Sequence, residues 1–179
     1  MNTLFRGGSI ATETEIKISD LLVVDDKIAD IGLDLPVLDA KVVDCDGLIL
    51  LPGGVDPHAH FSLSMFNTIS SDNHFTGHRA AAFGGTTTVM DFTSQSPGEP
   101  LQQSIDLSRS TAAEMAAVDY SFHVNVTDFS DDVANEIKGL PSQGLTTLKV
   151  FTAYNGRLRI SDQEIAKVLN ITRENGMLV

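Results

Sequence analysis

Short apolar runs separated by aspartate and glycine fill the opening part of the chain. The segments EIKISDLLVV, KIADIG and AKVVDCDGLIL are rich in β-branched and aliphatic residues, and this composition favours short strands. Asp25 and Asp26 lie between two of these runs, and aspartate tolerates turn conformations because its side chain bonds nearby backbone. The pattern predicts a hairpin tip at this point and a small β-rich domain over residues 1–52.

The pattern changes after Pro52, where apolar runs begin to alternate with longer stretches of helical period. Such alternation is typical of successive βα units and a parallel sheet. Strands are predicted near residues 50–56, 86–92, 119–126 and 146–151. Helices are predicted near residues 73–83, 101–117, 131–138 and 162–175. The last helix has the clearest limits, because Ser161 and Glu164 have capping-box spacing and Gly176 follows as a C-cap glycine would.

Four βα units amount to about half of a (β/α)8 barrel, which typically needs about 250 residues. Four parallel strands could instead form a complete open sheet, but the apolar residues Met177–Val179 look like the start of a fifth strand. We therefore expect an α/β fold. In it, residues 53–179 form the first four βα units of an incomplete TIM-type barrel, preceded by a β-rich (sandwich) segment, and the chain is truncated from a longer protein.

The overall charge excludes some classes of partner. The chain has a formal net charge of −12 and no cluster of Lys and Arg, so neither nucleic acid nor an anionic membrane is an expected partner. The sequence also lacks the long apolar run of a membrane span and the basic leader of a secretory signal. Cys45 is the single cysteine and cannot form an internal disulfide. These features predict a soluble, cytoplasmic protein.

The string LPGGVDPHAHF contains the most informative candidate for chemistry. In an extended strand, residues two apart point to the same side, so His58 and His60 could bind one metal ion through neutral imidazole nitrogens. A His-x-His spacing alone is a weak signal. Its place at the carboxyl end of the first barrel-type strand strengthens the signal, because active sites of (β/α)8 barrels gather at that end.

Four ordered segments resemble the dihydropyrimidinase and hydantoinase family of the amidohydrolase superfamily. PGGVDPHAHF is similar to the family's first metal motif, AAAFGGTTTVMDF to its second strand with the preceding helix, DYSFHVNVTD to its third strand and LKVFTAYNG to its fourth. With the β-rich opening included, the resemblance covers nearly all of the chain. It implies the amino-terminal part of a metal-dependent hydrolase that opens cyclic amides or imides to N-carbamoyl amino acids.

The resemblance also implies the cofactor and its ligands. Lys149 occupies the position of the family's lysine whose amine is carboxylated, so that the carbamate bridges two metal ions. Two divalent ions, expected to be zinc, would be held by His58, His60 and carboxylated Lys149. An unmodified lysine cation would oppose metal ions beside it, whereas a carbamate supplies an anionic oxygen to each.

Further residues are assigned to substrate by the same resemblance. Tyr154 falls where the family's tyrosine donates to the substrate carbonyl oxygen as it becomes an oxyanion, and such a donor is worth most when it is pre-aimed. The segment Ser62–Asn73 is predicted to be a polar loop that lines the pocket for the ring substituent. Met65 and Phe66 lie in this loop and are candidate specificity residues.

Other polar residues are placed outside the ligand set. His74 and His78 are one helical turn apart, a spacing that can bind metal, but a solvated helix face is the preferred interpretation. His123 is expected to pack or hydrogen-bond near the barrel mouth. Asp91 ends the second predicted strand and is a candidate to contact the metal ligands without binding the metal itself.

The implied protein has open alternatives. The family takes two further histidines and a catalytic aspartate from later strands, so the 179 residues are expected to be inactive alone. Dihydroorotase is one alternative, although its motif usually continues with arginine where this chain has Phe61; allantoinase is closer and stays open. A non-catalytic assembly protein is another, against which the joint presence of His58, His60 and Lys149 argues. Family analogy suggests a small-molecule substrate and a homotetramer.

Overall fold

The amino-terminal unit, Met1–Pro52, is built around one mixed sheet. The computed structural model describes residues 2–37, 39–65 and 67–179. The strands of this unit are β1 (Thr3–Ala11), β2 (Ile16–Val24), β3 (Lys27–Gly32), β4 (Lys41–Asp44) and β5 (Ile49–Leu50). β2 pairs antiparallel with both β1 and β3, whereas β4 and β5 pair parallel with β1. Asp25 lies in the β2–β3 turn with a φ of 56°, which confirms the predicted hairpin tip.

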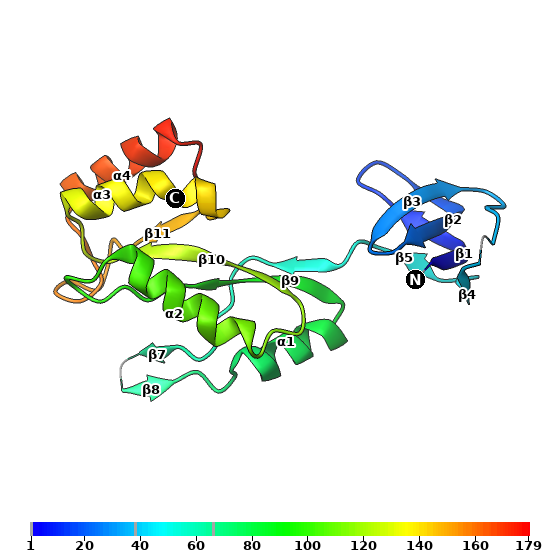
Figure 1. Ribbon diagram of the computed structural model, residues 1–179, viewed down its shortest axis with the longest axis horizontal. Helices are drawn as coiled ribbons and strands as arrows, with labels where there is room; N and C mark the ends of the chain where they lie inside the picture. The colour runs from blue at the N-terminus through cyan, green and yellow to red at the C-terminus, as the bar shows by residue number, and fades with distance from the viewer. Residues whose placement is uncertain (1, 38, 66) are drawn as a thin grey trace. The chain divides into compact units, whose positions relative to one another are not determined.

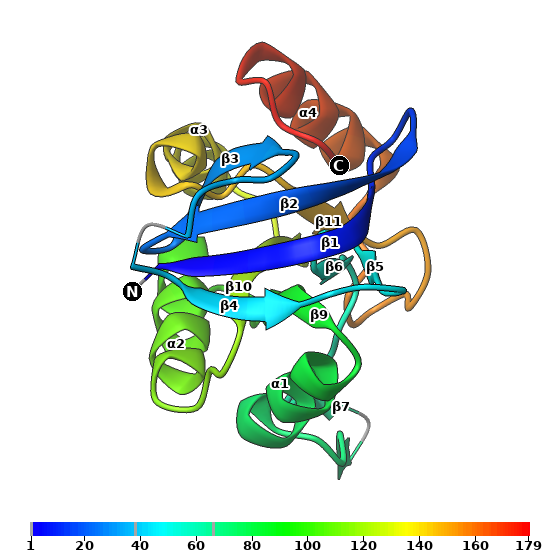
Figure 2. The same ribbon diagram turned by 90° about the vertical axis from the view of Figure 1, so that its right-hand side faces the viewer.

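The second unit, Gly53–Val179, contains a parallel sheet in the order β11-β10-β9-β6. Its strands are β6 (Gly54–Asp56), β9 (Thr86–Phe92), β10 (Asp119–Val126) and β11 (Leu148–Val150). The helices between and after them are α1 (His74–Phe83), α2 (Leu101–Ala113), α3 (Asp131–Gly139), the 3-10 turn η1 (Leu140–Gln143) and α4 (Asp162–Glu174). Figure 1 shows β9, β10 and β11 side by side, and Figure 2, which looks along them, shows the helices in an arc around the strands.

Strand alternation separates the two faces of this sheet. Phe122, Val124 and Val126 of β10 are buried in a hydrophobic cluster that includes residues from α2, α3 and α4. The intervening residues of β10, among them His123 and Asn125, therefore face the opposite side of the sheet. That side corresponds to the inside of a barrel, so side chains from successive strands can meet there.

After α4 the chain forms a single β-bridge next to β11. Leu178 forms a parallel bridge with Thr147, and its backbone exchanges hydrogen bonds with Thr146 and Leu148, both at 2.9 Å. The predicted capping box of α4 is present, with Ser161 and Glu164 each bonding the other's backbone. The predicted start of α4 is therefore confirmed, and an isolated β-bridge at Leu178 lies where the sequence predicted the opening of a fifth strand.

Some predicted boundaries were wrong. The run predicted near 50–56 is two strands, β5 and β6, because the segment between them contains Pro52, which has no N–H to donate. The helix predicted to reach residue 117 ends at Ala113, and the amide of Ala117 donates instead to the His78 ring at 3.3 Å. Within Ser62–Asn73, predicted as a loop, β7 (Ser64–Met65) and β8 (Thr68–Ile69) form a short antiparallel ribbon. None of the described helices is long and apolar enough to cross a membrane.

Candidate metal centre

His58 and His60 lie just beyond β6, at the carboxyl end of the parallel sheet. The Asp56 carboxylate accepts the N–H of His58 at 3.0 Å, and the N–H of Ala59 donates to the carbonyl of Met90 on β9 at 2.9 Å. These bonds hold the motif against the neighbouring strand. The two imidazole rings have their centroids 5.1 Å apart in an edge-on arrangement, so the chain brings both rings to one place.

Phe92, the last residue of β9, supports both imidazoles. Its ring centroid lies 4.8 Å from that of His60 in a stacked arrangement and 4.6 Å from that of His58. Phe92 is buried, so it forms an apolar wall that limits the positions of the two rings. Sequence reasoning missed this residue. The available signal was its place at the end of a predicted strand next to the strand that precedes the histidines.

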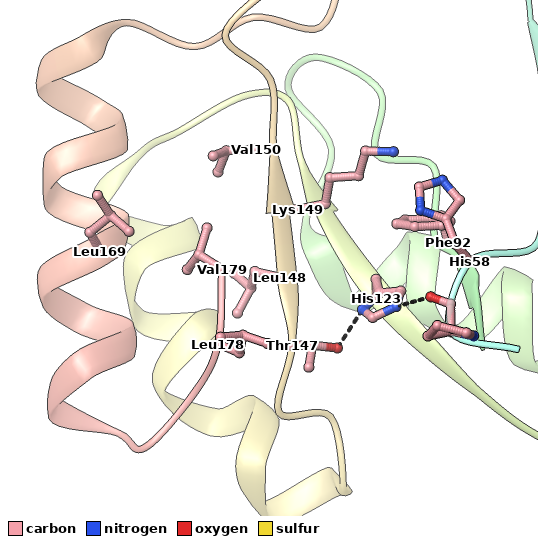
Figure 3. A pocket seen from close by; sticks show the side chains of 11 residues that line it. His58, Phe92, His123, Thr147, Leu148, Lys149, Val150, Leu169, Leu178 and Val179 are labelled. Atoms are coloured by element: carbon pink, nitrogen blue, oxygen red, sulfur yellow. Dashed lines mark hydrogen bonds between the residues drawn. The ribbon is translucent and has the colours of Figure 1, made fainter. Parts of the chain in front are cut away.

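Lys149 reaches the same place from β11. Its Nζ atom lies 4.1 Å from the centre of the Phe92 ring and 5.1 Å from the centre of the Phe151 ring. Figure 3 shows the Lys149 side chain directed toward Phe92 and His58, on the opposite side of the strand from Leu148 and Val150. His58, Phe92 and Lys149 share the lining of a cavity of about 510 Å³. The residues predicted to act together therefore converge.

The surroundings of Lys149 and His60 shift both side chains toward their uncharged forms. Burial lowers the pKa of Lys149 from its ordinary value, although an aromatic face by itself attracts a cation. Burial also lowers the pKa of His60, with smaller contributions from the nearby positive charges of Lys149 and His58. A neutral imidazole is the form that binds a metal ion, and a neutral amine is the form that can react with carbon dioxide.

The donors present fit part of a metal site. The Nδ1 atom of His60 is buried and has no hydrogen-bond partner within the described residues, so its lone pair or proton is uncompensated. A metal ion bound there would satisfy such a nitrogen. No group of three or more His, Cys, Asp and Glu side chains in the described residues is arranged to hold a metal ion. The ligand set is therefore partial unless Lys149 becomes an anionic ligand.

His123 joins two strands beneath this cluster. Its Nε2 atom lies 2.8 Å from the carbonyl oxygen of Pro57, and its Nδ1 atom lies 2.7 Å from the hydroxyl of Thr147. A carbonyl only accepts, so Nε2 donates to Pro57, and in the neutral ring Nδ1 then accepts from the Thr147 hydroxyl. Pro57 directly precedes His58, and Thr147 lies two residues before Lys149. The expected hydrogen-bonding role of His123 near the strand ends is thus seen in the structure.

The prediction for His74 and His78 was wrong. Both side chains are buried, with 3% and 0% of their surface exposed, and do not lie on a solvated face. Nδ1 of His74 lies 3.3 Å from Nε2 of His78, and Nε2 of His74 faces Asp91 at 3.6 Å. The i, i+4 spacing was visible, but no local signal showed that this face of α1 packs onto the end of β9.

Comparison with known proteins gives the same family as the sequence motifs. The chain is 39% identical to a D-hydantoinase from Geobacillus stearothermophilus over 100% of its own length, which is 38% of that relative. The solved structure of a dihydropyrimidinase from Brevibacillus agri matches 99% of this chain and 39% of that protein, with 40% identity and a TM-score of 0.96. The chain belongs to the dihydropyrimidinase and D-hydantoinase family. It corresponds to the amino-terminal part of the members that it matches. A dihydroorotase structure with 18% identity and a TM-score of 0.67 shares the fold. No protein-family model matches the sequence.

The structure describes two of the three remaining residues singled out from the family resemblance. Tyr154 is 51% exposed, with a φ of 65°, and its ring centroid lies 6.1 Å from that of Phe151, which neighbours the Lys149 amine. Met65 is partly buried in the β7–β8 ribbon and is not among the described residues that line the cavity beside Lys149. Phe66 lies outside the described residues.

Proposed function

We propose that the protein to which this hydantoinase-family segment belongs is a metal-dependent cyclic amidohydrolase. It would open dihydropyrimidine or hydantoin rings to N-carbamoyl amino acids. The observation that carries the proposal is the convergence of His58, His60 and Lys149 around Phe92 at the carboxyl ends of parallel strands. This convergence occurs in a chain that matches D-hydantoinases along its whole length.

The metal site would contain two divalent ions, proposed to be zinc. His58 and His60 would hold one ion, and Lys149, carboxylated on its amine, would bridge both. The burial that lowers the pKa of Lys149 supports this modification, because it favours the neutral amine. When bound, such ions supply Lewis acidity to the substrate carbonyl and lower the pKa of a water molecule.

The side chains of this segment would bind and orient the substrate around that site. Tyr154 is proposed to donate its hydroxyl proton in a hydrogen bond to the substrate oxygen that becomes negatively charged. Met65 and Phe66 are proposed to contact the ring substituent. The family's other two histidines and its catalytic aspartate come from later strands, so we propose that the 179 residues alone are inactive. By family analogy, the whole protein is proposed to be a homotetramer, and the sequence features given above favour a cytoplasmic location.

The test is ring opening by the full-length protein. Hydrolysis of hydantoin and dihydrouracil should be measured for the wild type and for the His58→Ala/His60→Ala variant, with dihydroorotate and allantoin as parallel substrates. The proposal is supported if the wild type opens hydantoin or dihydrouracil and the variant opens neither. Preferential opening of allantoin or dihydroorotate would instead support that alternative activity. If the folded, metal-loaded wild type opens none of the four rings, the proposal is refuted.

A further inference from the structure

The Asp91 carboxylate holds the backbone on both sides of the His60 ring. Asp91 is 5% exposed, and strand alternation places its side chain on the opposite face of β9 from Phe92. One of its oxygens accepts the N–H of Phe92 at 2.7 Å, and the other accepts the N–H of Phe61 at 3.3 Å. Phe61 directly follows His60, and the ring of Phe92 stacks on the His60 ring. One buried group therefore fixes both neighbours of the proposed ligand.

Two buried histidines lie behind this carboxylate. His74 faces Asp91 with Nε2 and His78 with Nδ1, at 3.6 and 3.3 Å respectively. The N–H of Ala117 donates to the Nδ1 atom of His78 at 3.3 Å. A buried polar side chain is costly unless it is partnered, so this line of contacts from α1 to Asp91 gives the carboxylate a fixed, polar surrounding.

The Phe61 ring is seated on the same face of α1. Its centroid lies 5.3 Å from the centroids of both His74 and His78. Gly77 lies between these histidines, and a Cβ atom placed on it would overlap the Phe61 ring. The missing side chain of Gly77 thus makes room for the residue next to His60. The ring position and the amide position of Phe61 are both determined by this helix and strand.

We propose that Asp91, His74, His78 and Gly77 form a positioning unit for the His58–His60 pair. This inference rests on the proposed function, because it assumes that the pair binds a metal ion. Asp91 accepts the backbone N–H groups of Phe61 and Phe92, and the face of α1 packs against the Phe61 ring. Outer partners that orient metal ligands typically change metal affinity by about 10–100-fold when they are removed.

The test measures release of Zn²⁺ from the full-length protein to a chelator. Asp91→Asn keeps the side-chain size but removes the charge and one acceptor oxygen. Asp20→Asn is a matched control, because Asp20 is also 5% exposed, accepts two backbone N–H groups and has a cationic nitrogen at 3.6 Å, but belongs to the amino-terminal unit. Both variants should lower the unfolding midpoint, whereas only Asp91→Asn should release zinc faster, by roughly tenfold or more.

A second pair of variants leaves every carboxylate in place. Gly77→Ala should displace the Phe61 ring and speed zinc release, while Gly139→Ala on α3 should match the wild type, since a Cβ atom there meets nothing within 4 Å. If Asp91→Asn does not fold, the glycine pair decides. The inference is overturned if Gly77→Ala and any folded Asp91→Asn release zinc at the rates of their controls. A wild type without bound metal would instead refute the proposed function.

Discussion

The Lys149 amine lies over the Phe92 ring at 4.1 Å, where burial lowers its pKa and two proposed histidine ligands lie nearby. If its carbamate bridges the metal ions, Lys149→Met should remove a ligand from both. The expected result in the full-length protein is a loss of hydrolysis of at least about 10³-fold, which corresponds to about 4 kcal/mol of transition-state stabilisation. The measurement is kcat/KM for hydantoin and dihydrouracil.

Lys138→Met provides the matched control for this substitution. Lys138 is exposed near the end of α3 and donates to the Asn135 side chain at 3.1 Å, so its loss should leave kcat/KM unchanged. Equal activity of the Lys149 and Lys138 variants would show that the buried lysine has no role in the reaction.

Asp91 gives a pH dependence of stability whose sign follows from its environment. Burial raises the pKa of Asp91 from 3.8 to about 6, against smaller lowering effects of the Phe92 and Phe61 amides. Between these values the unfolded chain ionises while the folded chain keeps the proton, so folded stability falls as pH rises and then levels off above about pH 6. Across this pH range the free energy of unfolding should fall by up to about 3 kcal/mol.

Urea unfolding of metal-free full-length protein at pH 4.5 and 6.5 measures this effect. The stability of the wild type relative to Asp91→Asn should decrease between the two pH values, because the asparagine does not titrate. A constant difference between the two proteins would contradict a raised pKa at Asp91.

At the scale of elements, His123 connects the segment that follows β6 and contains the two histidines with the segment that leads into β11 and Lys149. His123→Phe removes both the bond to the exposed Pro57 carbonyl and the bond to Thr147, so at about 1 kcal/mol for each hydrogen bond it should cost about 2 kcal/mol of unfolding free energy. Thr147→Val keeps the bond to Pro57 and should cost about 1 kcal/mol. Denaturant unfolding of the full-length protein compares them. Equal costs would mean that the Pro57 contact contributes nothing.

The elements themselves were largely predictable from periodicity. β9 and β10 begin and end where the apolar runs predicted, and α4 begins at the expected capping box. In these segments, local preference and burial agree. The face of α1 was not predictable, because Gly77, His74 and His78 carry little hydrophobic signal. Their burial results from packing of Phe61 and Asp91, which are distant in sequence.

At the scale of the whole molecule, the curled parallel sheet brings segments far apart in sequence to one end. His58 follows β6, Phe92 ends β9 and Lys149 lies on β11. Only the family resemblance suggested that the histidines and the lysine act together. Spacing alone could propose the His-x-His pair but not its aromatic support or the Asp91 cluster. Contacts of this kind depend on tertiary packing, which a single sequence does not display.

The central claim is that this end of the sheet forms part of a metal centre. Metal analysis of the purified full-length protein, wild type beside His58→Ala/His60→Ala, tests the claim most directly. We predict about two divalent ions per subunit in the wild type, as in two-metal hydrolytic sites, and at most one in the variant. A folded wild type without stoichiometric metal, or a variant with undiminished metal content, would contradict the account.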